Sequence, residues 1–268
     1  MSENKSIRIE RHHHVAWLIM DRPEKRNALG TGFFDELEEC ACELDRDPEV
    51  RVVVIRAEGK SFTAGIDLAD LSGMLQGGGA RDRETVRRTI VRFQESISWL
   101  ERCRKPVIAA IHGHCIGGGV DLACACDIRI ASRDAVFSIR ETRMGIIADL
   151  GTLQRFPSLV GQGWFMELAL TGRDFSADEA LRMGFITRLS EGQKGLIEEA
   201  SRLAEDIAAL PPLAVQGVKD VALHSRDFGV QAGLQYVAQK NAAQLPSEDL
   251  MEAIQAFREK RPPQFKGK

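Results

Sequence analysis

The chain has 268 residues, of which 44% are hydrophobic and 28% charged, a balance typical of a folded globular protein and not of a disordered or fibrous one. Its formal net charge is -3 and its basic residues are dispersed, which argues against nucleic-acid binding. We expect a cytoplasmic protein without a membrane partner, because no signal segment, bilayer-length apolar run or peroxisomal S-K-L ending is present.

The first part of the chain predicts a strand, a helix and a second strand. Residues 7–20 have the pattern of one or two strands. Residues 50–57 read VRVVVIRA, a β-branched run typical of a strand buried on both faces. Between them, residues 31–46 show helical spacing of apolar side chains, with Thr31 as the expected N-cap.

A polar, glycine-rich stretch at 76–80 precedes a long helix predicted over 81–102, and we expect this stretch to be a mobile loop. Pro106 ends that helix and starts a buried strand, VIAAIHG, which leads through Gly117–Gly119 into a short helix. Further strands are expected at 127–131 and 135–138.

Beyond Gly151 the pattern becomes helical. Ser176 and Glu179 have the spacing of a capping box for a helix that ends at Met183, and only 186–189 looks extended. Without a repeat or a Pro- or Ser-rich linker, the second half is expected to extend the first and not to form a free domain. The other predicted helices cover 161–170, 192–209, 213–226, 230–244 and 247–260.

Two strand ends are followed by glycine-bearing turns into helices, FTAGIDL at 62–68 and HGHCIGGGVD at 112–121. Two helix N-termini that converge on one point would stabilise an oxygen that gains negative charge, although such glycines can also serve only tight packing. The second turn is no nucleotide-binding P-loop, because Gly119 and Val120 replace the required Lys-Ser/Thr. Residues 59–63 do not form the nucleophile elbow of a serine hydrolase, because they lack its second glycine.

Three acidic residues, Asp121, Glu141 and Asp149, follow the second turn. In a shared pocket, burial and mutual repulsion would raise their pKa values and permit acid and base roles near neutral pH. An acidic residue considered alone is more commonly a surface residue or a helix cap than a catalytic group. No metal site is predicted, because residues 12–14, three histidines, lack acidic or cysteine partners nearby in sequence, and the six cysteines, expected to be reduced, lack metal-binding spacing.

Four segments together resemble the crotonase (enoyl-CoA hydratase/isomerase) superfamily. They are RPEKRNAL at 22–29, SFTAGIDL at 61–68, KPVIAAIHGHCIGGGVDLACACDIRIAS at 105–132 and ADLGTLQRFP at 148–157. GIDLADL, the GGGVD turn, the glutamate at 141 and IIADLGTLQR are most similar to the dienoyl-CoA isomerases. The resemblance implies an α/β fold of the ClpP/crotonase type, a spiral of β-β-α units over residues 1–189 followed by a helical oligomerisation region at 190–268.

The resemblance also implies roles for individual residues. The N–H groups of Ile66 and Gly118 match the superfamily's oxyanion-hole donors. Asp121 and Glu141 match the two catalytic glutamates of hydratases, the first shortened to aspartate, and Asp149 stands where dienoyl-CoA isomerases have an additional aspartate. The residues expected to bind the CoA substrate are Arg22, Lys25, Arg26 and Lys60, together with Ala64, Gly65, Asp67 and Gly117.

These roles predict an isomerase of fatty acid β-oxidation that converts 3,5-dienoyl-CoA to 2,4-dienoyl-CoA. Asp149 removes the proton at C2, Glu141 delivers one at C6, and Asp121 tunes or orients the pair. No cofactor is expected, because CoA is part of the substrate, and the superfamily's members are usually trimers or paired trimers.

Two alternative functions remain at this point. One is an enoyl-CoA hydratase, which adds water to a 2-enoyl-CoA, and the other is a noncatalytic acyl-CoA- or RNA-binding member of the superfamily. The retained Glu141 and Asp149 disfavour an inactive binder, and the net charge of -3 disfavours RNA.

Overall fold

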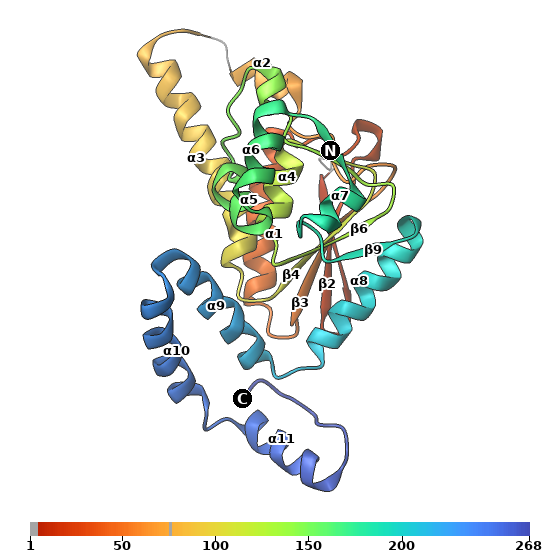
Figure 1. Ribbon diagram of the computed structural model, residues 1–268, viewed down its shortest axis with the longest axis vertical. Helices are drawn as coiled ribbons and strands as arrows, with labels where there is room; N and C mark the ends of the chain where they lie inside the picture. Colours follow the sequence, from red (N-terminus) through yellow and green to blue (C-terminus); the bar gives the residue numbers. More distant parts are fainter. Residues whose placement is uncertain (1–4, 75–76) are drawn as a thin grey trace.

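The structure is a computed structural model that describes residues 5–74 and 77–268. Within these residues the main sheet has the strand order β1-β2-β3-β4-β6-β9 (Figure 1). β1 and β2 form an antiparallel hairpin and every other neighbouring pair is parallel. The strands are β1 (Ile7–His12), β2 (Val15–Met20), β3 (Val52–Ala57), β4 (Val107–Ile111), β6 (Ile128–Ser132) and β9 (Arg188–Ser190).

The main sheet is buried on both faces, as the β-branched runs predict. In β3, Val53 and Ile55 belong to the cluster that includes helices α1 (Thr31–Arg46) and α3 (Ala80–Arg102). Val52 and Val54 face the other way and pack with α8 (Gly192–Ala208). The boundary predicted after residue 189 stays a prediction, but α8, which follows it, is part of the packed core.

A smaller sheet carries the second glycine-bearing turn. It has the order β5-β7-β8, formed by β5 (His114–Ile116), β7 (Val136–Ser138) and β8 (Asp174–Ser176). Phe137 of β7 stacks on Phe175 of β8 with ring centroids 5.3 Å apart. The predicted short helix after the glycines is α4 (Gly118–Cys124), which follows β5 and is buried along its whole length.

The remaining helices follow in the second half of the chain. The predicted capping box is confirmed, because Ser176 Oγ accepts from the Glu179 N–H at 3.2 Å and Glu179 Oε2 accepts from the Ser176 N–H at 3.1 Å. Helices α9, α10 and α11 extend away from the sheet (Figure 1). The helices are α5 (Thr152–Val160), α6 (Gln162–Thr171), α7 (Ala177–Arg182), α9 (Pro212–Phe228), α10 (Val230–Gln244) and α11 (Glu248–Glu259).

The structure corrects the predicted start of α1. Thr31 is the first helical residue, the N-cap is Gly30, and the Thr31 N–H donates to Asp70 Oδ2 at 2.7 Å. Asp70 belongs to α2 (Leu68–Met74), the helix that follows the first glycine-bearing turn, so the cap comes from another element. Of the expected mobile stretch at 76–80, Gln76 lies outside the described residues, and Gly79 is the N-cap of α3.

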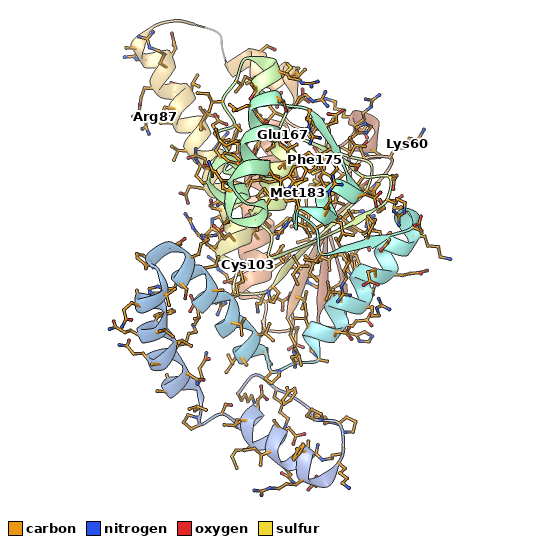
Figure 2. The ribbon with its side chains drawn as sticks, in the orientation of Figure 1. Lys60, Arg87, Cys103, Glu167, Phe175 and Met183 are labelled. Carbon is orange, nitrogen blue, oxygen red and sulfur yellow. The ribbon has the colours of Figure 1, made fainter. Side chains whose placement is uncertain are left out.

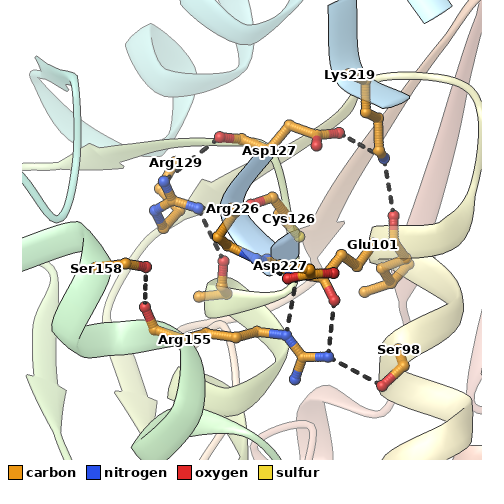
Figure 3. Close-up of polar contacts among 12 residues, drawn as sticks. Ser98, Glu101, Cys126, Asp127, Arg129, Arg155, Ser158, Lys219, Arg226 and Asp227 are labelled. Atoms are coloured by element: carbon orange, nitrogen blue, oxygen red, sulfur yellow. Dashed lines mark hydrogen bonds and ion pairs between the residues drawn. The ribbon is translucent and has the colours of Figure 1, made fainter. Parts of the chain in front are cut away.

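Ion pairs join α9 to the body of the protein (Figure 3). Lys219 Nζ lies 2.7 Å from Asp127 Oδ2 and also donates to the carbonyl oxygen of Leu100 at 3.1 Å. Glu101, at the end of α3, binds Arg155 of α5 and Arg226 of α9. None of the helices in the described ranges is long and apolar enough to cross a membrane.

Candidate active site

A cavity of about 660 Å³ opens between α2, α3 and the two glycine-bearing turns. We call it the acid-lined cavity, because Asp121, Glu141, Asp149 and Asp174 all line it. Its other walls are apolar and include Leu68, Leu71, Val86, Ile90, Phe93 and Met144. A space with apolar walls and a few carboxyl groups suits a largely apolar substrate that undergoes acid-base chemistry.

Asn27 anchors the first glycine-bearing turn. It is buried, has the left-handed φ of 52°, and its side-chain amide donates to the carbonyl oxygens of Glu58 and Ser61, both at 2.8 Å. The segment also contacts the turn through its main chain, because the Ala64 N–H donates to the Arg26 carbonyl oxygen at 3.0 Å. The RPEKRN segment therefore fixes the position of the first turn, a role that sequence analysis did not assign to Asn27.

The two glycine-bearing turns lie against each other. The Thr63 N–H donates to the His114 carbonyl at 2.9 Å, and the Ile116 N–H donates to the Thr63 carbonyl at 3.2 Å. Gly65 has φ +93°, and a Cβ added there would lie 2.8 Å from the Ile116 oxygen. Glycine at 65 therefore allows a backbone approach that no other residue could make without displacement.

Two backbone donors face this junction. Ile66 and Gly118 both line the acid-lined cavity, and neither N–H donates to an acceptor among the described residues. Gly118 is the first residue of α4, so its N–H has no acceptor within the helix. The structure thus brings together the two donors that the sequence predicts for an oxyanion hole, and their role stays a prediction.

Asp121 lies at the inner end of the cavity. It is only 1% exposed, and its Oδ1 accepts from the Thr152 N–H at 2.6 Å. Burial raises the pKa of Asp121 to about 6, although the hydrogen bond from Thr152 acts in the opposite direction. Thr152, the first residue of α5, was not singled out from the sequence, because its contribution is a main-chain N–H.

Glu141 and Asp149 also have raised pKa values. Glu141 Oε1 would lie 3.1 Å from a Cβ placed on Gly117, and its Oε2 is buried without a hydrogen-bond partner in the described part of the chain. Burial, followed by repulsion from Asp121, raises the pKa of Glu141 to about 7. Burial likewise raises the pKa of Asp149. The three predicted carboxyls therefore do share one cavity, and the raised pKa values of Asp121 and Glu141 lie near neutral pH.

The loop that carries Asp149 is fastened to α3. The Gln94 side-chain amide donates to the Asp149 carbonyl oxygen at 2.6 Å. Arg155, after the loop, donates through Nη2 to Ser98 Oγ at 2.9 Å and to Glu101 Oε2 at 3.1 Å (Figure 3). Sequence analysis did not identify Gln94, because a glutamine inside a helix carries no signal for a partner 55 residues away.

The predicted CoA-binding residues fall into two groups. Arg26, Ala64, Gly65 and Gly117 line the cavity. The other four, Arg22, Lys25, Lys60 and Asp67, are outside its lining in the described structure.

Within the second group, Asp67 Oδ1 accepts from the Ala69 N–H at 3.0 Å, and its Oδ2 lies 3.9 Å from Lys25 Nζ. Lys60 is exposed at the edge of the molecule (Figure 2). Three polar residues missed from the sequence, His114, Arg140 and Asp174, line the cavity instead. Arg140 forms an ion pair with Asp174, which also lines it, so this cation is already neutralised.

No group of three or more His, Cys, Asp or Glu residues in the described ranges is arranged to hold a metal ion. All six cysteines have free thiols. Burial raises the pKa of Cys103 to about 11, which leaves its thiol protonated at neutral pH.

The chain is similar to known proteins along nearly its whole length. A family model described as enoyl-CoA hydratase/isomerase matches residues 10–268. The Arabidopsis thaliana "Delta(3,5)-Delta(2,4)-dienoyl-CoA isomerase, peroxisomal" is 48% identical over 256 residues, which cover 94% of this chain and 92% of that protein. The mitochondrial Homo sapiens isomerase of the same description is 46% identical over 251 residues, which cover 92% of this chain and 76% of that protein.

Solved structures show the same architecture. The enoyl-CoA hydratase from Bacillus anthracis aligns with a TM-score of 0.92 and 33% identity, covering 98% of this chain and 100% of that one. A putative enoyl-CoA hydratase from Streptomyces coelicolor aligns with a TM-score of 0.90 and 32% identity, covering 100% of this chain and 96% of that one. The α/β fold that the resemblance implied is confirmed.

Proposed function

The chain belongs to the enoyl-CoA hydratase/isomerase family, and we propose that it is an isomerase that converts 3,5-dienoyl-CoA to 2,4-dienoyl-CoA. The observation that carries the proposal is the acid-lined cavity, in which three carboxyls with raised pKa values lie beside two unpaired backbone N–H groups of the described chain. Relatives named as isomerases of this kind, 41–48% identical to the chain, support it independently.

The thioester oxygen binds between the Ile66 and Gly118 N–H groups. When the C2–H bond breaks, its electron pair delocalises through C1 onto this oxygen, which gains negative charge, and along the diene as far as C6. Each donor that is already in place contributes about 3 kcal/mol to stabilising such an intermediate. The N-terminal end of α4 adds little beyond its first N–H, because the helix has only seven residues.

Two separate carboxyls move the protons. Asp149 accepts the proton from C2, a C2=C3 bond forms, the remaining double bond shifts to C4=C5, and Glu141 gives its proton to C6. A pKa of about 7 leaves a large fraction of Glu141 protonated at neutral pH, as this role requires. After turnover Asp149 holds a proton and Glu141 has lost one, so exchange with water restores the starting state.

Hydration is the second candidate, and the structure favours it less. A hydratase must hold a water molecule between two carboxyls, which here would be Asp121 and Glu141. One oxygen of Asp121 is already occupied by the Thr152 N–H, and Asp149 adds a third acidic group that hydration does not need. A noncatalytic binder would not need acids with raised pKa values in its cavity.

The CoA moiety is proposed to pass along the side of the cavity formed by Arg26 and the first turn. Arg26, Ala64 and Gly65 line the cavity there, whereas Lys25 and Lys60 would reach only phosphates outside it. The reaction as written needs no cofactor, since CoA is part of the substrate.

We further propose a homo-oligomer, either a trimer or a dimer of trimers. Large apolar side chains on the three last helices support it, since Phe257 is 86% exposed, Val230 77% and Val218 72%. The cytoplasmic location stays a prediction, and the Arabidopsis thaliana and Homo sapiens relatives carry the words peroxisomal and mitochondrial in their names.

The direct test uses a 3,5-dienoyl-CoA and follows the absorbance of the conjugated 2,4-dienoyl product, beside a hydration assay on a 2-enoyl-CoA. The protein is expected to shift the diene, and Asp149→Asn and Glu141→Gln each lower kcat by about 10²–10⁴-fold without unfolding the chain.

A matched control is Glu198→Gln on the exposed side of α8, which should leave both kcat and thermal stability unchanged. Rapid hydration without any diene shift would reverse the choice between isomerase and hydratase.

A further inference from the structure

The base assigned to C2 stands on a segment without regular structure. Residues 146–149 belong to no helix or strand, and Asp149 is only half-buried. A proton transfer to carbon requires the carboxyl to stay at a fixed distance from C2, and misplacement by about 1 Å can cost about 10²-fold in rate. Some contact outside the segment must therefore fix it.

Helix α3 supplies that contact at Asp149 itself and again at Arg155, six residues further along the chain. Gln94 is half-buried and donates from Nε2 to the Asp149 carbonyl oxygen at 2.6 Å. Ser98 and Glu101 lie four and seven residues further along the same face of α3 and bind Arg155, which follows the segment. Between these anchors, the Thr152 N–H donates to Asp121 Oδ1. The segment is thus tied to α3 outside the cavity and to Asp121 inside it.

Resting on the proposed function, we propose that Gln94 is a positioning residue that holds the carboxyl of Asp149 at the distance from C2 that proton removal requires. Loss of its amide leaves the Asp149 carbonyl without this donor, so the 149–150 peptide can rotate and carry the carboxyl away from C2. The oxyanion donors and the CoA side of the cavity belong to other elements. Gln94 therefore affects the rate of the chemical step and leaves substrate binding unchanged.

The first experiment compares Gln94→Met, which keeps the length of the side chain and removes its donor, with the unmodified protein in the diene-shift assay. We expect kcat to fall by about tenfold to a hundredfold while KM stays within about twofold. The matched control is Gln154→Met, at an exposed position on α5, which should retain both constants. A Gln94→Met protein with unchanged kcat, or with KM raised and kcat intact, overturns the inference.

A second measurement separates the two proton carriers. In D₂O, deuterium uptake at C2 of the 3,5-dienoyl substrate reports Asp149. Uptake at C6 reports Glu141 when the 2,4-dienoyl product is supplied alone, because the C6 proton then leaves and returns without any transfer at C2. Gln94→Met is expected to slow exchange at C2 by about tenfold more than exchange at C6, because only the Asp149 segment loses its anchor. Equal slowing at both positions, as a general loosening of the fold would cause, overturns the inference.

The Gln94→Glu variant provides a rescue and covers the case in which Gln94→Met does not fold. At neutral pH an ionised carboxylate cannot donate to the Asp149 carbonyl, whereas its protonated form can. The activity of this variant divided by that of the unmodified protein should rise as pH falls, and a ratio independent of pH contradicts the proposal.

If the unmodified protein does not shift the diene, the proposed function itself fails, and the role of Gln94 fails with it. An active parent with an unimpaired Gln94→Met variant overturns the role of Gln94 alone.

Discussion

Glu141 owes its raised pKa to its surroundings. Burial is the main cause of the raised pKa of Glu141, and repulsion from Asp121 is the next. Asp121 itself is buried more completely, but the Thr152 N–H stabilises its ionised form and limits the rise in its pKa. The two carboxyls therefore form a coupled pair in which the outer one holds its proton more strongly.

Asp121→Asn tests this coupling. The amide oxygen can still accept from the Thr152 N–H, but the negative charge near Glu141 is gone, so the pKa of Glu141 should fall below about 7. Glu141 must be protonated to donate at C6. The alkaline limb of the kcat/KM profile is therefore expected to move to lower pH, with lower activity at neutral pH.

The measurement is a set of kcat/KM values between about pH 5 and 9 for the variant and its parent. An alkaline limb in the same place for both proteins would mean that a group other than Glu141 controls it.

Residue types and spacing, together with the resemblance to the superfamily, predicted the acids and the backbone donors but not the residues that hold them. Asn27, Gln94 and Thr152 act through hydrogen bonds between main chain and side chain across 31 to 55 residues of sequence. Such partners share no periodic pattern, so they become visible only when the elements are assembled. The acids were identifiable because they follow a glycine-bearing turn and match motifs of the superfamily.

At the scale of elements, the first glycine-bearing turn limits which residues the site accepts. Gly65→Ala would place a Cβ 2.8 Å from the Ile116 oxygen in a backbone with φ +93°. Strain of this kind costs about 1–3 kcal/mol, and relief requires the two turns to separate. We expect a lower melting temperature and a loss of kcat/KM, since the Ile66 and Gly118 donors would move apart.

Chemical denaturation and the diene-shift assay together check this expectation. The matched control is Gly32→Ala in α1, where nothing lies within 4 Å of the added Cβ and a gain of about 0.5–1 kcal/mol is expected. A Gly65→Ala protein as stable and active as its parent would show that the turns do not need this close approach.

Long elements were predicted well, and among the short ones α4, β7 and β9 were predicted whereas β5 and β8 were missed. Helix α10 begins and ends at the predicted residues, and α3 begins one residue earlier than predicted. β5 and β8 have three residues each, too few for a periodic pattern of burial. Helix α5 contains Pro157, a residue that usually marks the end of a helix, so its sequence does not favour one.

At the scale of the whole molecule, the three last helices present apolar surface that the described chain leaves uncovered. Phe257→Asp would place a charge at the most exposed of these side chains. If the helices mediate assembly, this variant should sediment as a smaller species than its parent and keep its helical content.

Analytical ultracentrifugation over a range of concentrations measures the effect. Leu170→Asp on α6, at a side chain 65% exposed but outside the last three helices, is the control and should leave the mass unchanged. A parent protein that sediments as a monomer would refute the proposed assembly.

The arrangement of the whole chain was only partly predictable. The helical second half was expected, and the resemblance supplied the fold. Neither indicated that α8 covers one face of the main sheet, or that Lys219 of α9 reaches Asp127 across 92 residues of sequence. Both features depend on contacts between segments that are far apart in sequence. Local patterns of hydrophobicity do not encode such contacts.

The buried acids make folding of this protein a proton-consuming process. Folding raises the pKa of Asp121 from 3.8 to about 6 and that of Glu141 from 4.5 to about 7, so the native chain binds protons in that interval that the unfolded chain has released. Their contribution to stability is complete below the unfolded pKa values and is lost as pH rises through the folded ones. These two side chains thus favour the native state most below their unfolded pKa values of 3.8 and 4.5, and least above a pH of about 7.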